Sequence, residues 1–213
     1  MKNKIMILVI VIASCIINVG CGKVDADYYA SRGRIFIDQG NEDKALNYFN
    51  KAIKADPNYG YAYEARGIIY LNKREYDKAL LDFNKALLIN PASSMPYAGR
   101  GTVLAAKGQY KEALADLNKA IDLQPNNFLA FSSRGFVRYD EKDYDKAISD
   151  FNKAIELNPK YVDCYYSRAC AYACKKEYDK AWQDIHKVIE MGGENRIDPE
   201  FLQNLKKYSG REK

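Results

Sequence analysis

The pattern of apolar and polar positions repeats every 34 residues along the chain, starting at Ala26. Five blocks follow one another without a gap, spanning residues 26–59, 60–93, 94–127, 128–161 and 162–195. Within a block, apolar positions 4, 8 and 11 lie on one face of a helix, as do positions 17, 20, 24 and 27 of a second helix. A short polar break around position 15 separates the two patterns. Each block is therefore predicted to form two antiparallel amphipathic helices.

Small and large side chains recur at fixed positions of the block. Position 20 is alanine throughout: Ala45, Ala79, Ala113, Ala147 and Ala181. Position 8 reads Gly33, Gly67, Gly101, Gly135 and Ala169, and position 24 reads Phe49, Phe83, Leu117, Phe151 and Ile185. In an antiparallel pair these two columns face each other, so Gly67 is expected opposite Phe83. A small residue facing a large one allows the helices to approach closely and pack densely.

An arginine and an aspartate also recur at facing positions. Position 7 is always arginine: Arg32, Arg66, Arg100, Arg134 and Arg168. Position 23 is Tyr48 in the first block and then Asp82, Asp116, Asp150 and Asp184. The pattern predicts four ion pairs, Arg66–Asp82, Arg100–Asp116, Arg134–Asp150 and Arg168–Asp184, with Arg32 lying over the Tyr48 ring. The alternative is that these arginines bind an anionic ligand.

The end of the array carries its own helix signals. Pro57, Pro91, Pro125 and Pro159 each end a second helix, because proline has no N–H to donate and clashes with the preceding turn. After the fifth block, Asp198 and Pro199 have the residue types of an N-cap and a first helical position. An apolar stripe of Phe201, Leu202 and Leu205 follows. We expect a capping helix over about 198–208 that lies on block five, followed by a short tail at 209–213.

The spacing of these columns resembles the tetratricopeptide repeat. The resemblance covers residues 26–195, and it departs from the family pattern at Glu42, Ala169 and Gly193, all in the terminal blocks. It implies an all-α fold, an α-solenoid of five helix-turn-helix repeats plus the capping helix, in which each repeat gains its missing cover from its neighbours. It also implies a protein-protein interaction scaffold without catalytic activity.

In this family the first helices line a concave groove that binds partners. The residues that the resemblance assigns to the groove are Arg34, Asp38, Tyr61, Glu64, Ile68, Leu71, Asn72, Met95, Leu129, Phe136, Tyr139, Asp140 and Tyr166. This set is mainly apolar and aromatic, and it suits an amphipathic helix or an extended apolar peptide. Only Arg34 and Asn72 fit a clamp for a C-terminal carboxylate, which argues against that mode. The alternative is that several of these side chains merely pack between neighbouring helices.

The amino terminus has the pattern of an export signal. A basic start at 1–4 is followed by an apolar run over 5–19, and the chain turns polar from Lys23. The segment resembles a bacterial lipoprotein signal, with residues 1–20 removed, Cys21 lipidated and 21–25 as a short tether. Cys15 is the alternative lipidation site, and an uncleaved anchor or a plain secretory signal is also open. The implied location is the bacterial cell envelope, anchored by lipid and facing the periplasm or the cell exterior.

Composition adds little that points to chemistry. The formal charge is +5, but acids and bases alternate and no basic run appears, so nucleic-acid binding is not expected. His186 is the only histidine and stands at a polar surface position. Cys170 and Cys174 share a helix face toward the groove, but they lack the further ligands of a metal site. We expect no cofactor, no metal and no catalytic residues.

Three functions remain in view. The first is a lipid-anchored envelope scaffold that binds a peptide or amphipathic helix of a protein partner. The second is a stoichiometric assembly subunit of a secretion, pilus or outer-membrane biogenesis complex. The third is a ligand-binding or redox protein that uses the cluster of Cys164, Cys170 and Cys174.

Overall fold

The computed structural model describes residues 25–210. The predicted signal, both candidate lipidation sites (Cys15 and Cys21) and the last residues of the predicted tail, 211–213, lie outside the described residues. The described chain forms two compact units, which divide between residues 92 and 93. None of the helices within 25–210 is long and apolar enough to cross a membrane.

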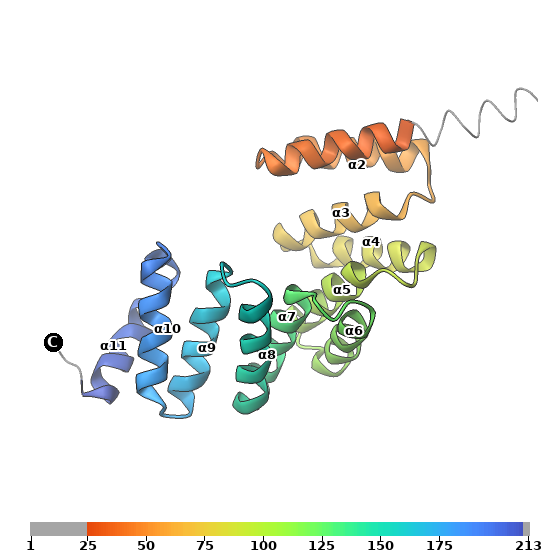
Figure 1. Ribbon diagram of the computed structural model, residues 1–213. Coiled ribbons are helices and arrows are strands. Elements are labelled where there is room, and N and C mark those ends of the chain that lie inside the picture. Colours follow the sequence, from red (N-terminus) through yellow and green to blue (C-terminus); the bar gives the residue numbers. More distant parts are fainter. Residues whose placement is uncertain (1–24, 211–213) are drawn as a thin grey trace, which may run out of the picture. The chain divides into compact units, whose positions relative to one another are not determined.

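Every regular element of the described chain is helical, and the helices run in antiparallel pairs (Figure 1). The predicted all-α fold class is confirmed. The first unit contains a helix over 25–38, then α2 (Glu42–Ala55), α3 (Gly60–Asn72) and α4 (Tyr76–Ile89). The second unit contains α5 (Ser94–Ala106), α6 (Tyr110–Leu123), α7 (Phe128–Asp140), α8 (Tyr144–Leu157), α9 (Val162–Cys174), α10 (Tyr178–Glu190), a short 3₁₀ turn (Glu194–Arg196) and α11 (Pro199–Ser209).

The turn inside each hairpin depends on one residue in the left-handed conformation, at position 15 of the block. Gly40 and Gly108 adopt it at φ 70° and 74°, where glycine has no steric penalty. Arg74, Lys142 and Lys176 adopt the same conformation at φ 58° to 63°. For residues with a Cβ atom this costs about 1–2 kcal/mol, so the hairpin geometry outweighs a local preference at three places.

The contact between the two helices of a hairpin is the predicted one of small against large. A Cβ atom added to Gly67 would lie 2.8 Å from the Phe83 ring, and one added to Gly135 would lie 2.7 Å from the Phe151 ring. Phe83 and Phe151 are completely buried. Glycine at position 8 is therefore required by close helix approach rather than by its backbone conformation.

The predicted arginine–aspartate pairs are all present. In each pair the arginine donates from Nε and Nη2 to both oxygens of the aspartate, as in Arg66–Asp82 at 2.7 Å for both bonds. The other three pairs have donor–acceptor distances of 2.6 to 3.0 Å. Arg66 also donates from Nη1 to Asn50 of the preceding repeat at 2.5 Å. These bonds bind helices to one another, which supports the structural interpretation of the arginines over an anion site.

The first block lacks the arginine–aspartate pair, as the sequence predicts. Position 23 is Tyr48, and the Arg32 guanidinium lies 5.8 Å from the centre of its ring and 5.7 Å from that of Phe36. The two rings stack on each other at 5.2 Å. Arg32 is thus held by aromatic faces instead of a carboxylate.

The last hairpin is covered by α11, as the sequence predicts. Asp198 is its N-cap and accepts a hydrogen bond from the Glu200 backbone N–H at 2.9 Å. Leu205 is buried against the α9–α10 hairpin, and Trp182 Nε1 donates to Ser209 Oγ at 3.0 Å. The helix therefore covers the apolar face that the last hairpin would otherwise expose.

Candidate partner-binding site

Two adjoining pockets open on the first-helix side of the last two repeats, within the second unit. The first, of about 480 Å³, is called the thiol pocket and is lined by Tyr139, Cys170, Ala173, Cys174, Lys176, Tyr178, Phe201, Asn204, Leu205 and Tyr208. The second, of about 300 Å³, is called the aspartate pocket and is lined by Phe136, Tyr139, Asp140, Asp163, Tyr166, Ser167 and Cys170. They share Tyr139 and Cys170, so the two pockets adjoin each other.

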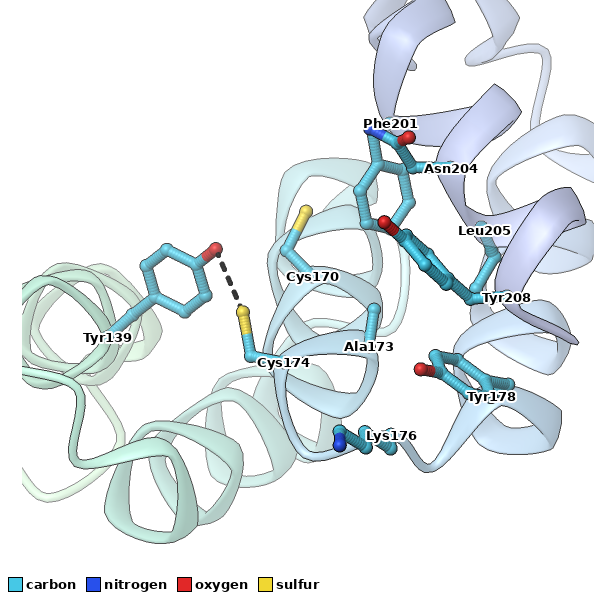
Figure 2. A pocket seen from close by; sticks show the side chains of 10 residues that line it. All are labelled: Tyr139, Cys170, Ala173, Cys174, Lys176, Tyr178, Phe201, Asn204, Leu205 and Tyr208. Atoms are coloured by element: carbon cyan, nitrogen blue, oxygen red, sulfur yellow. Dashed lines mark hydrogen bonds between the residues drawn. The ribbon is translucent and has the colours of Figure 1, made fainter.

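The thiol pocket is lined by residues of four helices, α7, α9, α10 and α11. Figure 2 shows α9 at its centre, presenting Cys170, Ala173 and Cys174, with Tyr139 of α7 on one flank and α11 on the other. The α11 side contributes aromatic and aliphatic surface from Phe201 and Leu205. Apart from Lys176 and Asn204, the lining is apolar, aromatic or thiol-bearing, which is the composition of pockets that receive apolar side chains.

Local sequence explains why α9 can form the floor of this pocket. Its outward positions carry cysteine and alanine, which are short, whereas the flanking helices carry large aromatic rings. Tyr166 of α9 contacts Phe201 of α11 edge to face, with ring centroids 5.6 Å apart. The Tyr166 hydroxyl accepts a hydrogen bond from the Asp198 backbone N–H at 3.2 Å. These contacts fix α11 beside α9, while Cys174 stays exposed and Cys170 and Ala173 are partly buried.

Burial disfavours the thiolate form of two thiols in this region, Cys164 and Cys170. Burial raises the pKa of Cys170 to about 12 and that of the neighbouring Cys164 to about 11. Cys164 Sγ donates to Ser132 Oγ at 3.2 Å, and Cys174 Sγ lies 3.6 Å from the Tyr139 hydroxyl. Burial, followed by the bond to Cys174, raises the pKa of Tyr139. A reactive cysteine needs an accessible thiolate, so Cys164 and Cys170 do not fit the redox hypothesis.

The aspartate pocket has a different character. Phe136 is 40% exposed, and the partly buried rings of Tyr139 and Tyr166 also line it. Two carboxylates, Asp140 and Asp163, stand among these rings. Tyr110 donates to Asp140 Oδ2 at 3.3 Å, whereas Asp163 forms an ion pair with Arg196 at the surface.

The predicted groove residues fall into separate groups. In the second unit, Phe136, Tyr139, Asp140 and Tyr166 line the aspartate pocket. Met95 and Leu129 are partly buried, and Met95 Sδ accepts from Asn127 Nδ2 at 3.8 Å, so Met95 contributes to packing between neighbouring helices. The binding role of these residues stays a prediction.

In the first unit, the predicted groove residues differ in how accessible they are. Asn72 is exposed and donates to Glu42 Oε1 at 3.4 Å. The exposed members of the set are Arg34, Asp38, Tyr61 and Asn72, and the partly buried members are Glu64, Ile68 and Leu71.

Sequence reasoning missed the contribution of α11 to the site. The sequence predicts Phe201 and Leu205 only as the inner face of a cap, and its apolar pattern does not point to Asn204 or Tyr208. Tyr208 is 61% exposed, and this exposed aromatic residue one turn after the buried Leu205 is the signal that could have pointed to the contribution of α11. No group of three or more His, Cys, Asp or Glu within 25–210 could hold a metal ion.

The sequence matches family models of the tetratricopeptide repeat over four stretches. Models described as tetratricopeptide repeat match residues 31–94, 128–161 and 151–183, and one described as TPR repeat matches 101–141. No curated protein matches the chain.

Several solved structures share the fold. YrrB, described as a TPR protein with an unusual peptide-binding site, is 28% identical with a TM-score of 0.57, and the match covers 85% of this chain and 92% of YrrB. MamA is 25% identical with a TM-score of 0.60, over 78% of this chain and 91% of MamA. PilW, described as a widely conserved type IV pilus biogenesis factor, has a TM-score of 0.75 over 87% of this chain and 86% of PilW.

PilW is only 18% identical, so its likeness concerns the fold alone. The repeat matches carry the sequence evidence, and the helical hairpins carry the structural evidence. Together they show that the chain belongs to the tetratricopeptide-repeat proteins.

Proposed function

We propose that the chain is a non-catalytic scaffold that holds a peptide or amphipathic helix of a partner protein in the two pockets of its second unit. The observation that carries this proposal is the thiol pocket, an open and mainly apolar depression lined by residues of four helices. Its volume lies within the range of about 300–1,000 Å³ that is typical of ligand sites. The likeness to YrrB, which has a peptide-binding site, supports the same class of function.

The energetics favour an apolar anchor residue. Seating one leucine or phenylalanine side chain removes apolar surface of both partners from water, which stabilises a complex by about 1.5–3 kcal/mol for each fully buried side chain. The floor is formed by a regular helix and fixed by the Tyr166–Phe201 contact, so little ordering is needed on binding. A segment with apolar residues at helical spacing can place a second anchor on the neighbouring aromatic rings.

The test begins with selection of binders from random peptides displayed on phage, using the whole protein. The affinity of a selected peptide is then measured by fluorescence anisotropy for wild type and for Cys174→Glu. Cys174 is exposed and lines the thiol pocket, so the fold should tolerate glutamate while its bulk and charge enter the pocket. We expect a loss of roughly tenfold or more in affinity.

The matched control is Ala115→Glu, which places the same side chain at an exposed position of α6 outside both pockets. It should leave the affinity unchanged. Selection of no binder, or equal effects of the two substitutions, would count against the proposed site.

We further propose that the protein acts at the bacterial cell envelope through a lipid on Cys21. Support comes from the sequence of the amino terminus, where a basic start and an apolar run precede Gly20 and Cys21. The test is metabolic labelling of cells with an alkyne fatty acid. Cys21→Ser should abolish the label and Cys15→Ser should retain it, and the reverse result would assign the lipid to Cys15.

A further inference from the structure

The two adjoining pockets differ in charge. The only charged side chain that lines the thiol pocket is Lys176, whereas the charged side chains that line the aspartate pocket are Asp140 and Asp163. Tyr139 and Cys170 line both pockets. A bound segment would therefore meet a positive group in one pocket and negative groups in the other, which sets a preferred direction.

The negative character of the aspartate pocket has several sources. Asp140 is the last residue of α7, where the helix dipole adds negative potential. No cation in the described part of the chain forms an ion pair with Asp140. The negative charge of Asp140 disfavours ionisation of Tyr110 and is the largest cause of its raised pKa. Glu141 contributes to the same shift. A cation at this end of α7 would thus be attracted by several groups at once.

The ion pair of Asp163 with Arg196 does not remove this attraction. Arg196 is half exposed and Asp163 is about one-third exposed, so the pair lies at the surface, where such pairs contribute about 0–1 kcal/mol. The contact involves Asp163 Oδ1. A second cation could approach the carboxylate from the pocket side.

The walls of the aspartate pocket suit the same ligand. Phe136, Tyr139 and Tyr166 present aromatic rings, and the π face of an aromatic ring attracts a cation. The methylene stem of a lysine or arginine side chain also packs well against such rings. Aromatic walls with carboxylates at the rim therefore select a long side chain with a charged end over a purely apolar one.

Resting on the proposed function, we infer that the partner segment carries a lysine or arginine whose side chain enters the aspartate pocket while an apolar residue enters the thiol pocket. The cationic group lies between Asp140 and Asp163, and its aliphatic stem lies against Phe136 and Tyr166. This arrangement has the opposite charge to a clamp for a C-terminal carboxylate.

The test uses two small probes of similar size, n-butylammonium and 1-butanol, which differ in charge. Each is titrated into the whole protein, and binding is followed by the NMR shifts of the Phe136 and Tyr166 ring protons. We expect n-butylammonium to bind roughly fivefold more tightly than 1-butanol at low salt, with the preference reduced at high salt. Equal affinities, or no saturable shift with n-butylammonium, would overturn the inference.

Variants assign the preference to the two carboxylates. In Asp140→Asn, and in the double variant that carries both Asp140→Asn and Asp163→Asn, the affinities of the two probes should lie within roughly twofold of each other. Asp140→Asn alone is informative if loss of the Arg196 ion pair disturbs the fold of the double variant. Asp122→Asn, at an exposed position of α6 outside both pockets, should keep the full preference. Retention of the preference in Asp140→Asn and in the double variant would contradict the assignment.

The outcome separates this inference from the proposed function. If selected peptides bind through the thiol pocket but n-butylammonium binds no more tightly than 1-butanol, the scaffold function stands and the prediction of a lysine or arginine in the partner segment is wrong. If the probe binds selectively but no peptide does, the chemistry of the aspartate pocket stands and peptide binding fails.

Discussion

Removing Arg168 should destabilise the fold more than removing Arg134, although the two arginines occupy the same position of their repeats. Arg168 donates to both oxygens of Asp184 at 2.8 and 2.6 Å, and it is the only cation in the described chain that forms an ion pair with this aspartate. Asp150 is bonded by Arg134 and also by Arg138, whose Nη1 lies 2.8 Å from Oδ2. Both aspartates are nearly inaccessible, at 4% and 3% exposure.

The expected magnitudes follow from this difference. Arg168→Met leaves a buried carboxylate without a cation, which costs about 3–5 kcal/mol. Arg134→Met leaves Asp150 paired with Arg138, so we expect a smaller loss of about 1–3 kcal/mol, comparable to losing hydrogen bonds to a charged group. Methionine retains much of the aliphatic stem in both variants.

The measurement is urea unfolding of wild type and both variants, followed by circular dichroism at 222 nm. The free energies of unfolding are compared if the three fitted m-values agree. The double variant Arg168→Met with Asp184→Leu supplies a further control, because it removes both charges and should recover much of the lost stability. Equal losses for Arg168→Met and Arg134→Met, or a loss below about 1 kcal/mol for Arg168→Met, would refute the reasoning.

The same variant should respond to pH with a definite sign. Burial raises the pKa of Asp184, and the bonds from Arg168 oppose that rise. Without Arg168 the folded-state pKa should rise further, so the folded state favours the protonated acid. The deficit of Arg168→Met relative to wild type should therefore shrink as pH falls from neutrality toward the unfolded pKa of about 4.

Three further outcomes are expected. Gly135→Ala should lower the free energy of unfolding by about 1–2 kcal/mol in urea titrations despite the better helix propensity of alanine, because its Cβ would lie 2.7 Å from the Phe151 ring; unchanged stability would contradict the close approach. Lys142→Gly should raise the unfolding free energy by about 0.5–1 kcal/mol, since Lys142 has a φ of 63°, and a loss of stability would count against strain in this turn. At pH 8, mass-spectrometric mapping after iodoacetamide treatment should find exposed Cys174 modified well before the partly buried Cys170, whose pKa of about 12 leaves about one thiolate in ten thousand; comparable rates would refute the raised pKa of Cys170.

Much of the fold could be predicted because the repeat encodes its own contacts. The spacing between positions 7 and 23 is enough to predict the Arg66–Asp82 bond, since antiparallel helices joined by a short turn have a fixed register. The same register predicts Gly67 against Phe83. The N-cap and proline at Asp198 and Pro199 predict where the covering helix begins.

The candidate site was less predictable because it arises where the repetition stops. Tyr166 belongs to the repeat pattern, but its partner Phe201 lies in α11, which follows no period of 34. The apolar stripe predicts which face of α11 packs on block five. Spacing gives no register between α11 and α9, so it does not predict that Asn204 and Tyr208 border the thiol pocket. The left-handed turns at Arg74 and Lys142 were equally unpredictable, because these residue types ordinarily avoid that conformation.

The sequence by itself determined the helical hairpins, the facing of glycine and phenylalanine, and the arginine–aspartate pairs, because each depends on positions within one repeat and on helical periodicity. The tertiary structure decided the volume of the thiol pocket, the partial burial of Cys170 and the placement of Asp140 and Asp163 around one pocket. These properties depend on the gaps that remain when helices of unequal side-chain size pack side by side. Such gaps follow from three-dimensional packing, which one-dimensional spacing does not specify.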